Sequence, residues 1–147
     1  MGSVGKSTTT NNTSVLNNDG ELNSDGSVTM KYLHISQSTQ NYGSQFGQDI
    51  EPKGEYMSFI SPTNTNQIEL PNYTYGTIRF NKPLVLEWKS TGPNGWKKDL
   101  SEMFGGKTGK ALSNAVKKAG YDGIMTYDVY KGQRMWSEIV NLSGTKL

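Results

Sequence analysis

The sequence has no cysteine and a single histidine, and only 33% of its 147 residues are apolar. The lack of cysteine excludes a disulfide framework, a thiol nucleophile and a zinc site built on cysteine. The single histidine excludes metal sites that need several imidazole ligands, so we expect no metal site. Any chemistry must therefore depend on His34 together with carboxylates, hydroxyl groups and aromatic rings.

Long apolar runs are also missing. No stretch approaches the ~18 apolar residues of a transmembrane helix, and the N-terminus lacks the apolar core of a secretion signal. The charge is nearly balanced, with 15 basic and 13 acidic residues. Six lysines between Lys97 and Lys118 form a basic cluster, but most such clusters are solvated surface, and bidentate phosphate recognition favours arginine. We expect neither a membrane nor a nucleic acid as partner.

Apolar residues are unevenly distributed along the chain. Residues 1–29 hold six apolar side chains, no aromatic ring and fifteen serine, threonine or asparagine residues. Such a segment buries too little apolar surface to offset the entropy lost on ordering. We therefore predict a tail over residues 1–29, disordered or ordered only by docking on a larger assembly, and one domain over residues 30–147.

The domain is rich in predicted strands. Their pattern is interrupted by two helical segments, without a regular alternation of strand and helix, which favours the α+β class. Gly120 and Asp122 are expected to end the second helix and form a turn, and Lys131-Gly132 to form a hairpin turn. The predicted strands cover residues 31–36, 56–60, 75–80, 84–88, 123–129 and 135–142, and the predicted helices cover residues 96–104 and 108–119.

Alternation within two of these strands predicts which side chains share a face. Residues 32, 34 and 36 share one face of the first strand, which includes His34. The last strand places Glu138 on one face with Trp136 and Val140. A carboxylate among apolar neighbours costs free energy unless it is paired or functional. Glu138 is therefore a candidate functional residue.

Three segments of the domain carry the candidate site residues. They are residues 32–36 with His34, residues 54–58 with Tyr56, and residues 119–124 followed by a strand with Glu138. In order and spacing they resemble the ADP-ribosyltransferase superfamily, in the His–Tyr–Glu branch shared by diphtheria-like toxins and poly-ADP-ribose polymerases. The resemblance spans about residues 31–142 and is strongest to small phage and bacterial members. It implies an α+β fold with a split β-sheet core and a few short helices.

The resemblance assigns roles to single residues. His34 would hydrogen-bond the adenosine ribose of NAD, Tyr56 would stack on the nicotinamide ring, and the catalytic Glu138 would bind the nicotinamide ribose and stabilise its oxocarbenium ion. Ser36 and Ser58 are expected in the same NAD site. The second tyrosine of the family matches Tyr75 or Tyr73, and the sequence does not decide between them.

Two positions depart from the family pattern. Trp136 stands two residues before the glutamate, where arginine-modifying relatives carry Glu, which argues against arginine as the acceptor. Ile35 follows the histidine, where a glycine or another small residue is usual.

The resemblance implies an enzyme for which NAD is a substrate. It would be a mono-ADP-ribosyltransferase of the toxin or effector kind that releases nicotinamide and modifies an acceptor macromolecule, expected to be a protein, in the bacterial cytoplasm. NAD glycohydrolase, with water as acceptor, is a close variant. The alternative is a catalytically inactive binding module of the same fold, such as a phage inhibitor or a virion component that docks through its polar tail.

Overall fold

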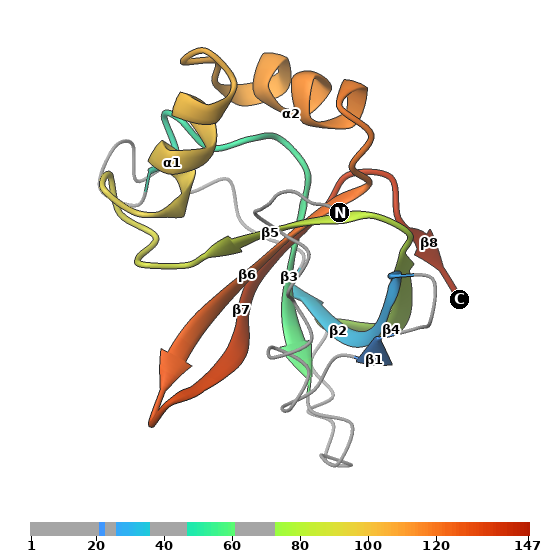
Figure 1. The fold of residues 1–147 in the computed structure, drawn as a ribbon. Helices are drawn as coiled ribbons and strands as arrows, with labels where there is room; N and C mark the ends of the chain where they lie inside the picture. The colour runs from blue at the N-terminus through green and yellow to red at the C-terminus, as the bar shows by residue number, and fades with distance from the viewer. Residues whose placement is uncertain (1–20, 23–25, 36–46, 61–72) are drawn as a thin grey trace.

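The computed structural model describes residues 21–22, 26–35, 47–60 and 73–147. Within them the chain forms a mixed sheet with two helices, which confirms the α+β class (Figure 1). The elements in chain order are β1 (Glu21–Leu22), β2 (Val28–Ile35), β3 (Glu55–Ile60), β4 (Tyr73–Phe80), β5 (Pro83–Glu87), α1 (Trp96–Met103), α2 (Gly109–Lys118), β6 (Gly123–Tyr130), β7 (Gln133–Asn141) and β8 (Thr145–Lys146).

The strands follow the order β5-β6-β7-β3-β2-β4-β8, and β1 pairs with β2 outside this path. Only β5 and β6 pair in parallel among the described strands. Both helices lie together on one side of the sheet, near the β5–β6–β7 end, while the sheet curls toward β4 and β8 (Figure 1). The strands that carry the three family-like segments, β7, β3 and β2, are therefore consecutive neighbours.

Each strand and helix predicted from the periodicity is present, with ends shifted by one or a few residues. Gly120 adopts φ +105° directly after α2, and Lys131 and Gly132 both have positive φ in the β6–β7 turn. These left-handed conformations end the helix and match the right-handed twist of the hairpin.

The first residues of β2 fall within the segment predicted as a tail. Val28 is buried, and the short strand β1 pairs with Val28 and Thr29. Ordered structure therefore begins before residue 30. The other tail residues, 1–20 and 23–25, lie outside the described residues, as does Ser36.

The sheet separates two apolar clusters. One consists of strand side chains enclosed by the curl of the sheet, and the other lies between the sheet and the two helices. The buried residues of the strand cluster are Val28, Met30, Tyr32, Met57, Ile78, Phe80, Met125, Trp136 and Ile139. The buried residues of the helix cluster are Leu84, Trp96, Leu100, Leu112, Val116, Ile124 and Val140.

A β-bulge in β7 decides which cluster Trp136 joins. Met125 pairs with Ile139, but Tyr127 pairs with Trp136, so β7 has one more residue than β6 between these pairs. The Thr126 hydroxyl donates a hydrogen bond to the Glu138 carbonyl at this point, at 2.7 Å. The extra residue turns Trp136 to the face of Ile139. The prediction that Trp136 shares a face with Glu138 and Val140 is therefore wrong, because alternation fails at a bulge.

Asp122 lies in the loop between α2 and β6 and ties it to the β4–β5 turn and to the residues that follow β7. Its carboxylate accepts hydrogen bonds from the backbone N–H groups of Asn81 and Lys82, and its carbonyl accepts from those of Leu142 and Ser143. This agrees with the turn-forming role expected for Asp122.

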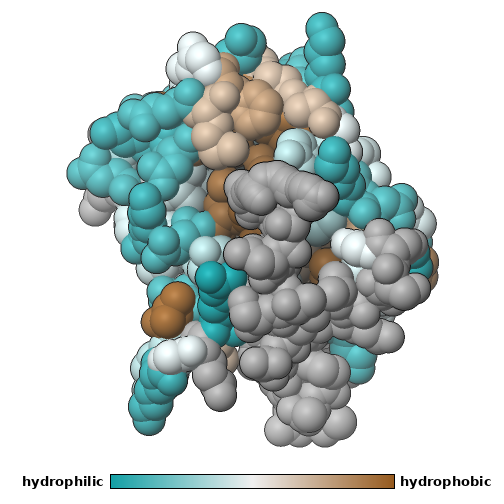
Figure 2. Space-filling model, in the orientation of Figure 1, coloured by the Kyte–Doolittle hydropathy of each residue, from teal (hydrophilic) through white to brown (hydrophobic). Residues whose placement is uncertain are grey.

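The lysine cluster is mostly solvated. Hydrophilic residues cover much of the described surface of the helical layer in Figure 2. Five of the six lysines between residues 97 and 118 are exposed, whereas Lys97 is buried. No helix among the described residues is long and apolar enough to cross a membrane.

Candidate functional site

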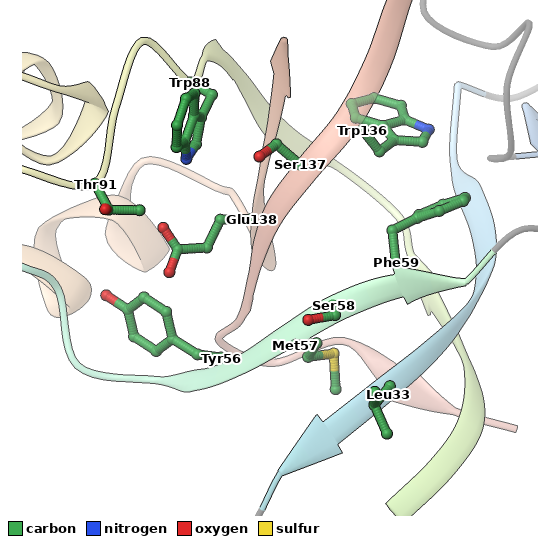
Figure 3. Close-up of a pocket in the computed structure, with 10 residues that line it drawn as sticks. All are labelled: Leu33, Tyr56, Met57, Ser58, Phe59, Trp88, Thr91, Trp136, Ser137 and Glu138. Carbon is green, nitrogen blue, oxygen red and sulfur yellow. The ribbon is translucent and has the colours of Figure 1, made fainter. Parts of the chain in front are cut away.

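A cavity opens where β3 and β7 part. The two strands pair from Glu55–Ser58 to Glu138–Asn141 and no further, although β3 continues to Ile60. The cavity has a volume of about 560 Å³ (Figure 3). It is lined by Leu33, Tyr56, Met57, Ser58, Phe59, Trp88, Thr91, Trp136, Ser137 and Glu138. Aromatic rings therefore form much of its wall, with hydroxyl groups and one carboxylate among them.

Strand register brings Tyr56, Ser58 and Glu138 together. Ser58 pairs directly with Glu138, and Tyr56 pairs with Val140. Residues opposite each other on paired strands share a face, so all three predicted site residues lie on one face of the sheet. In Figure 3 the Glu138 carboxylate extends toward Tyr56 and Thr91.

The Glu138 carboxylate is partly buried and hydrogen-bonded. Its Oε1 accepts the indole N–H of Trp96 at 2.8 Å, and Trp96 itself is fully buried at the start of α1. Burial raises the pKa of Glu138 above its ordinary value, the Lys97 ammonium and the Trp96 hydrogen bond lower it, and the Glu51 carboxylate raises it; the net effect is upward. The carboxylate is therefore oriented by Trp96, and burial is the largest cause of the rise in its pKa.

The loop before α1 places Trp96 against the strands. The Trp96 backbone N–H donates to the Trp88 carbonyl at 3.1 Å, so the chain folds back tightly between these two residues. A Cβ atom at Gly95 would overlap the Ser90 carbonyl, which explains why a glycine is needed immediately before the helix.

The hydroxyl group and the ring of Tyr56 both have neighbours that fix the side chain. Its hydroxyl donates to the Pro52 carbonyl at 2.8 Å, and its ring centroid lies 6.5 Å from that of Trp96. Burial and the nearby carboxylates of Glu51 and Glu138 raise the pKa of the Tyr56 phenol. The phenol therefore stays protonated at physiological pH and acts as a fixed aromatic wall.

His34 does not line the cavity. Leu33 pairs with Ser58 and lines it, so the next residue along β2 points to the opposite face. Its Nδ1 lies 2.8 Å from the Tyr56 carbonyl oxygen, and its Nε2 lies 3.9 Å from Oε2 of Glu55. The imidazole is thus tied to the backbone of the strand that carries Tyr56 rather than to the cavity itself.

The second tyrosine also lies away from the cavity lining. Tyr75 pairs with Leu33 and shares its face, which places it two strands from Ser58, about 10 Å across the sheet. Tyr73 pairs with Ile35, one face-sharing position further along β4. The structure therefore leaves the choice between the two tyrosines open.

Seven lining residues were not predicted as site residues: Leu33, Met57, Phe59, Trp88, Thr91, Trp136 and Ser137. Trp96 was not predicted as a site residue either, although its indole N–H donates a hydrogen bond to Glu138. The indole N–H of a buried tryptophan usually has an acceptor, and this tendency is the one signal that could have suggested such a partner. Nothing in the sequence names the acceptor, because the bond joins segments 42 positions apart.

No protein-family model, curated protein or solved structure matches the chain. The site must therefore be interpreted from its own chemistry. Among the described residues, no group of three or more His, Cys, Asp or Glu side chains is placed to hold a metal ion. The cavity instead combines one oriented carboxylate with aromatic walls, which suits an organic ligand that has a flat ring and develops positive charge.

Glu138→Gln is expected to raise the free energy of unfolding at neutral pH, with a gain that shrinks as the pH falls. Because burial raises the pKa of Glu138 in the folded protein, the folded state binds this proton more tightly than the unfolded chain does. The resulting stability is full below the ordinary pKa of a glutamate and is lost as the pH rises through the folded pKa. Glutamine carries no charge and keeps an oxygen for the Trp96 N–H.

Urea denaturation of both proteins from about pH 4 to about pH 8 measures this difference. Glu102→Gln is the control, because that carboxylate is exposed on α1 and pairs with Lys98. An identical Glu138→Gln effect at both ends of the range would contradict the prediction.

Proposed function

We propose that this chain is a mono-ADP-ribosyltransferase with a split-sheet ADP-ribosyltransferase fold. It would cleave NAD, release nicotinamide and transfer ADP-ribose to an acceptor macromolecule. The observation that carries the proposal is the convergence of Tyr56, Ser58 and Glu138 in one cavity at the parting of β3 and β7. The fold assignment is supported by the neighbouring positions of the three strands that carry His34, Tyr56 and Glu138.

The proposed reaction breaks the bond between the nicotinamide nitrogen and C1′ of its ribose. The bonding electron pair leaves with nicotinamide, which becomes neutral, and positive charge develops on the ribose as an oxocarbenium ion. A nucleophile of the acceptor then attacks C1′ and loses its proton. If water takes that place, the same site is an NAD glycohydrolase.

Two features of the cavity suit this reaction. The ionised Glu138 carboxylate, held by Trp96 in a partly buried setting, would stabilise the positive charge more strongly than water does. The rings of Tyr56 and Trp88 lie near the carboxylate and offer flat apolar surfaces to the nicotinamide ring (Figure 3).

The placement of His34 favours a second candidate, a binding module that does not turn over NAD. The histidine expected at the adenosine ribose is not among the residues that line the cavity, and its Nδ1 lies 2.8 Å from the Tyr56 carbonyl oxygen. A fold that has lost catalysis no longer requires an imidazole in the cavity. This candidate would act by docking on a partner macromolecule.

Nicotinamide release separates the two candidates. The purified full chain is incubated with NAD, with and without bacterial lysate, and nicotinamide is quantified by chromatography while NAD binding is measured by calorimetry. Release above the protein-free rate supports an enzyme, and labelled NAD then distinguishes transfer to a lysate protein from hydrolysis. The absence of both release and binding, with lysate present, contradicts the enzyme and supports the binding module.

A further inference from the structure

Lys97 is a buried cation beside the candidate site. The residue is only 3% exposed, whereas its neighbour on α1, Lys98, keeps half of its side chain in solvent. An ammonium group is rarely buried to this extent, because leaving water costs several kcal/mol unless partners compensate. The surroundings of Lys97 must therefore supply that compensation.

Three groups enclose the ammonium. The Glu51 Oε1 lies 2.9 Å from Nζ, and the ring centroids of Tyr56 and Trp96 lie 5.6 Å and 5.9 Å from it. On another side, a Cβ atom at Gly47 would come within 2.9 Å of the Lys97 stem, so the chain packs closely there. Both rings that face the ammonium also contact Glu138 or the cavity.

The enclosed cation is connected to the candidate catalytic group through its two aromatic neighbours. Trp96 precedes Lys97 on α1 and donates its indole N–H to Glu138. Tyr56, the other ring beside the ammonium, lines the same cavity as Glu138. Consecutive residues at the start of α1 therefore supply a hydrogen-bond donor to this carboxylate and a buried cation whose charge acts on it.

We propose that Lys97 is a positioning residue for Glu138: its enclosed ammonium and the adjacent Trp96 N–H keep that carboxylate ionised and oriented at the cavity. The catalytic meaning of this role rests on the function proposed above. The coupling between the two charges does not, and it can be measured without any turnover.

The charged groups around Glu138 act in opposite directions. From α1, Lys97 favours the ionised carboxylate; from the segment before β3, Glu51 disfavours it; from β3, Tyr56 presents a neutral phenol. Removing Lys97 should therefore make Glu138 harder to ionise, and removing Glu51 should make it easier. A purely structural role of the Lys97–Glu51 pair predicts no such opposite signs, because either substitution would simply break the same bond.

The Trp96 indole N–H is a suitable probe of Glu138 ionisation, because it donates a hydrogen bond to that carboxylate. Its ¹H–¹⁵N resonance is identified by its loss in Trp96→Phe and followed with pH in the wild type, Lys97→Met, Glu51→Gln and Lys98→Met. We expect the titration midpoint to rise in Lys97→Met, to fall in Glu51→Gln and to stay unchanged in the control Lys98→Met. Glu138→Gln should remove the titration altogether.

Shifts of the same sign in Lys97→Met and Glu51→Gln, or no shift in either folded variant, would overturn the proposal. If Lys97→Met does not fold, Glu51→Gln and the conservative variant Lys97→Arg, expected to keep the wild-type midpoint, still test it. The acid limb of nicotinamide release should move with the resonance. Opposite resonance shifts in a protein that releases no nicotinamide would support the coupling and contradict only the proposed function.

Discussion

Glu138→Gln is expected to lower kcat for nicotinamide release by about 10²–10³-fold while NAD binding persists. The substitution preserves shape and an oxygen for the Trp96 N–H, so the cavity wall stays in place. It removes the negative charge that would stabilise the oxocarbenium ion. An interaction made mainly in the transition state reduces kcat rather than substrate affinity. Steady-state release measured by chromatography, with NAD affinity from calorimetry, gives both quantities.

The exposed Glu102 provides the matched control for that experiment. Glu102→Gln makes the same chemical change on the outer side of α1, where the carboxylate pairs only weakly with Lys98. Its kcat should equal that of the wild type. Equal release by Glu138→Gln and the wild type would remove the assigned mechanism, and a loss shared by both variants would show that the effect does not come from the cavity.

Local patterns in the sequence were sufficient to predict the elements. In α2, Leu112 and Val116 are buried at the expected helical spacing, and Gly120 ends the helix in the left-handed conformation. The β6–β7 turn at Lys131-Gly132 also depends on local backbone preference, because both residues adopt positive φ. These features depend on backbone preferences and periodicity within a few residues, and so the sequence shows them directly.

The faces of neighbouring strands depend on pairing that no local pattern contains. Alternation correctly separates Leu33 from His34, but only the register of Leu33 with Ser58 shows that the histidine faces away from Tyr56. The bulge that turns Trp136 away from Glu138 likewise depends on a pairing between β6 and β7. The sequence therefore named Tyr56, Ser58 and Glu138 as candidates, but not the strand pairing that brings them to one cavity.

Phe80→Ala is expected to lower the free energy of unfolding by about 3–5 kcal/mol, the largest stability effect we predict. The Phe80 side chain is fully buried at the end of β4. Its ring lies against the backbones of Gly123 and Gly144, where any Cβ atom would overlap it or approach within 2.7 Å. Since small domains are stable by only about 5–15 kcal/mol, this loss brings the protein close to unfolding. Urea denaturation measures it, with the exposed Met103→Ala as control.

A double substitution tests whether the Phe80 ring itself explains the glycine at position 123. Gly123 does not adopt positive φ, so Gly123→Ala should cost stability only because its methyl group meets Phe80. In the Phe80→Ala background that space is empty, and Gly123→Ala should then be nearly neutral. The two costs should therefore add to more than the cost of the double variant, by about 0.5–3 kcal/mol as is usual for residues in contact. Strict additivity would mean that contact with the Phe80 ring does not explain the cost of Gly123→Ala.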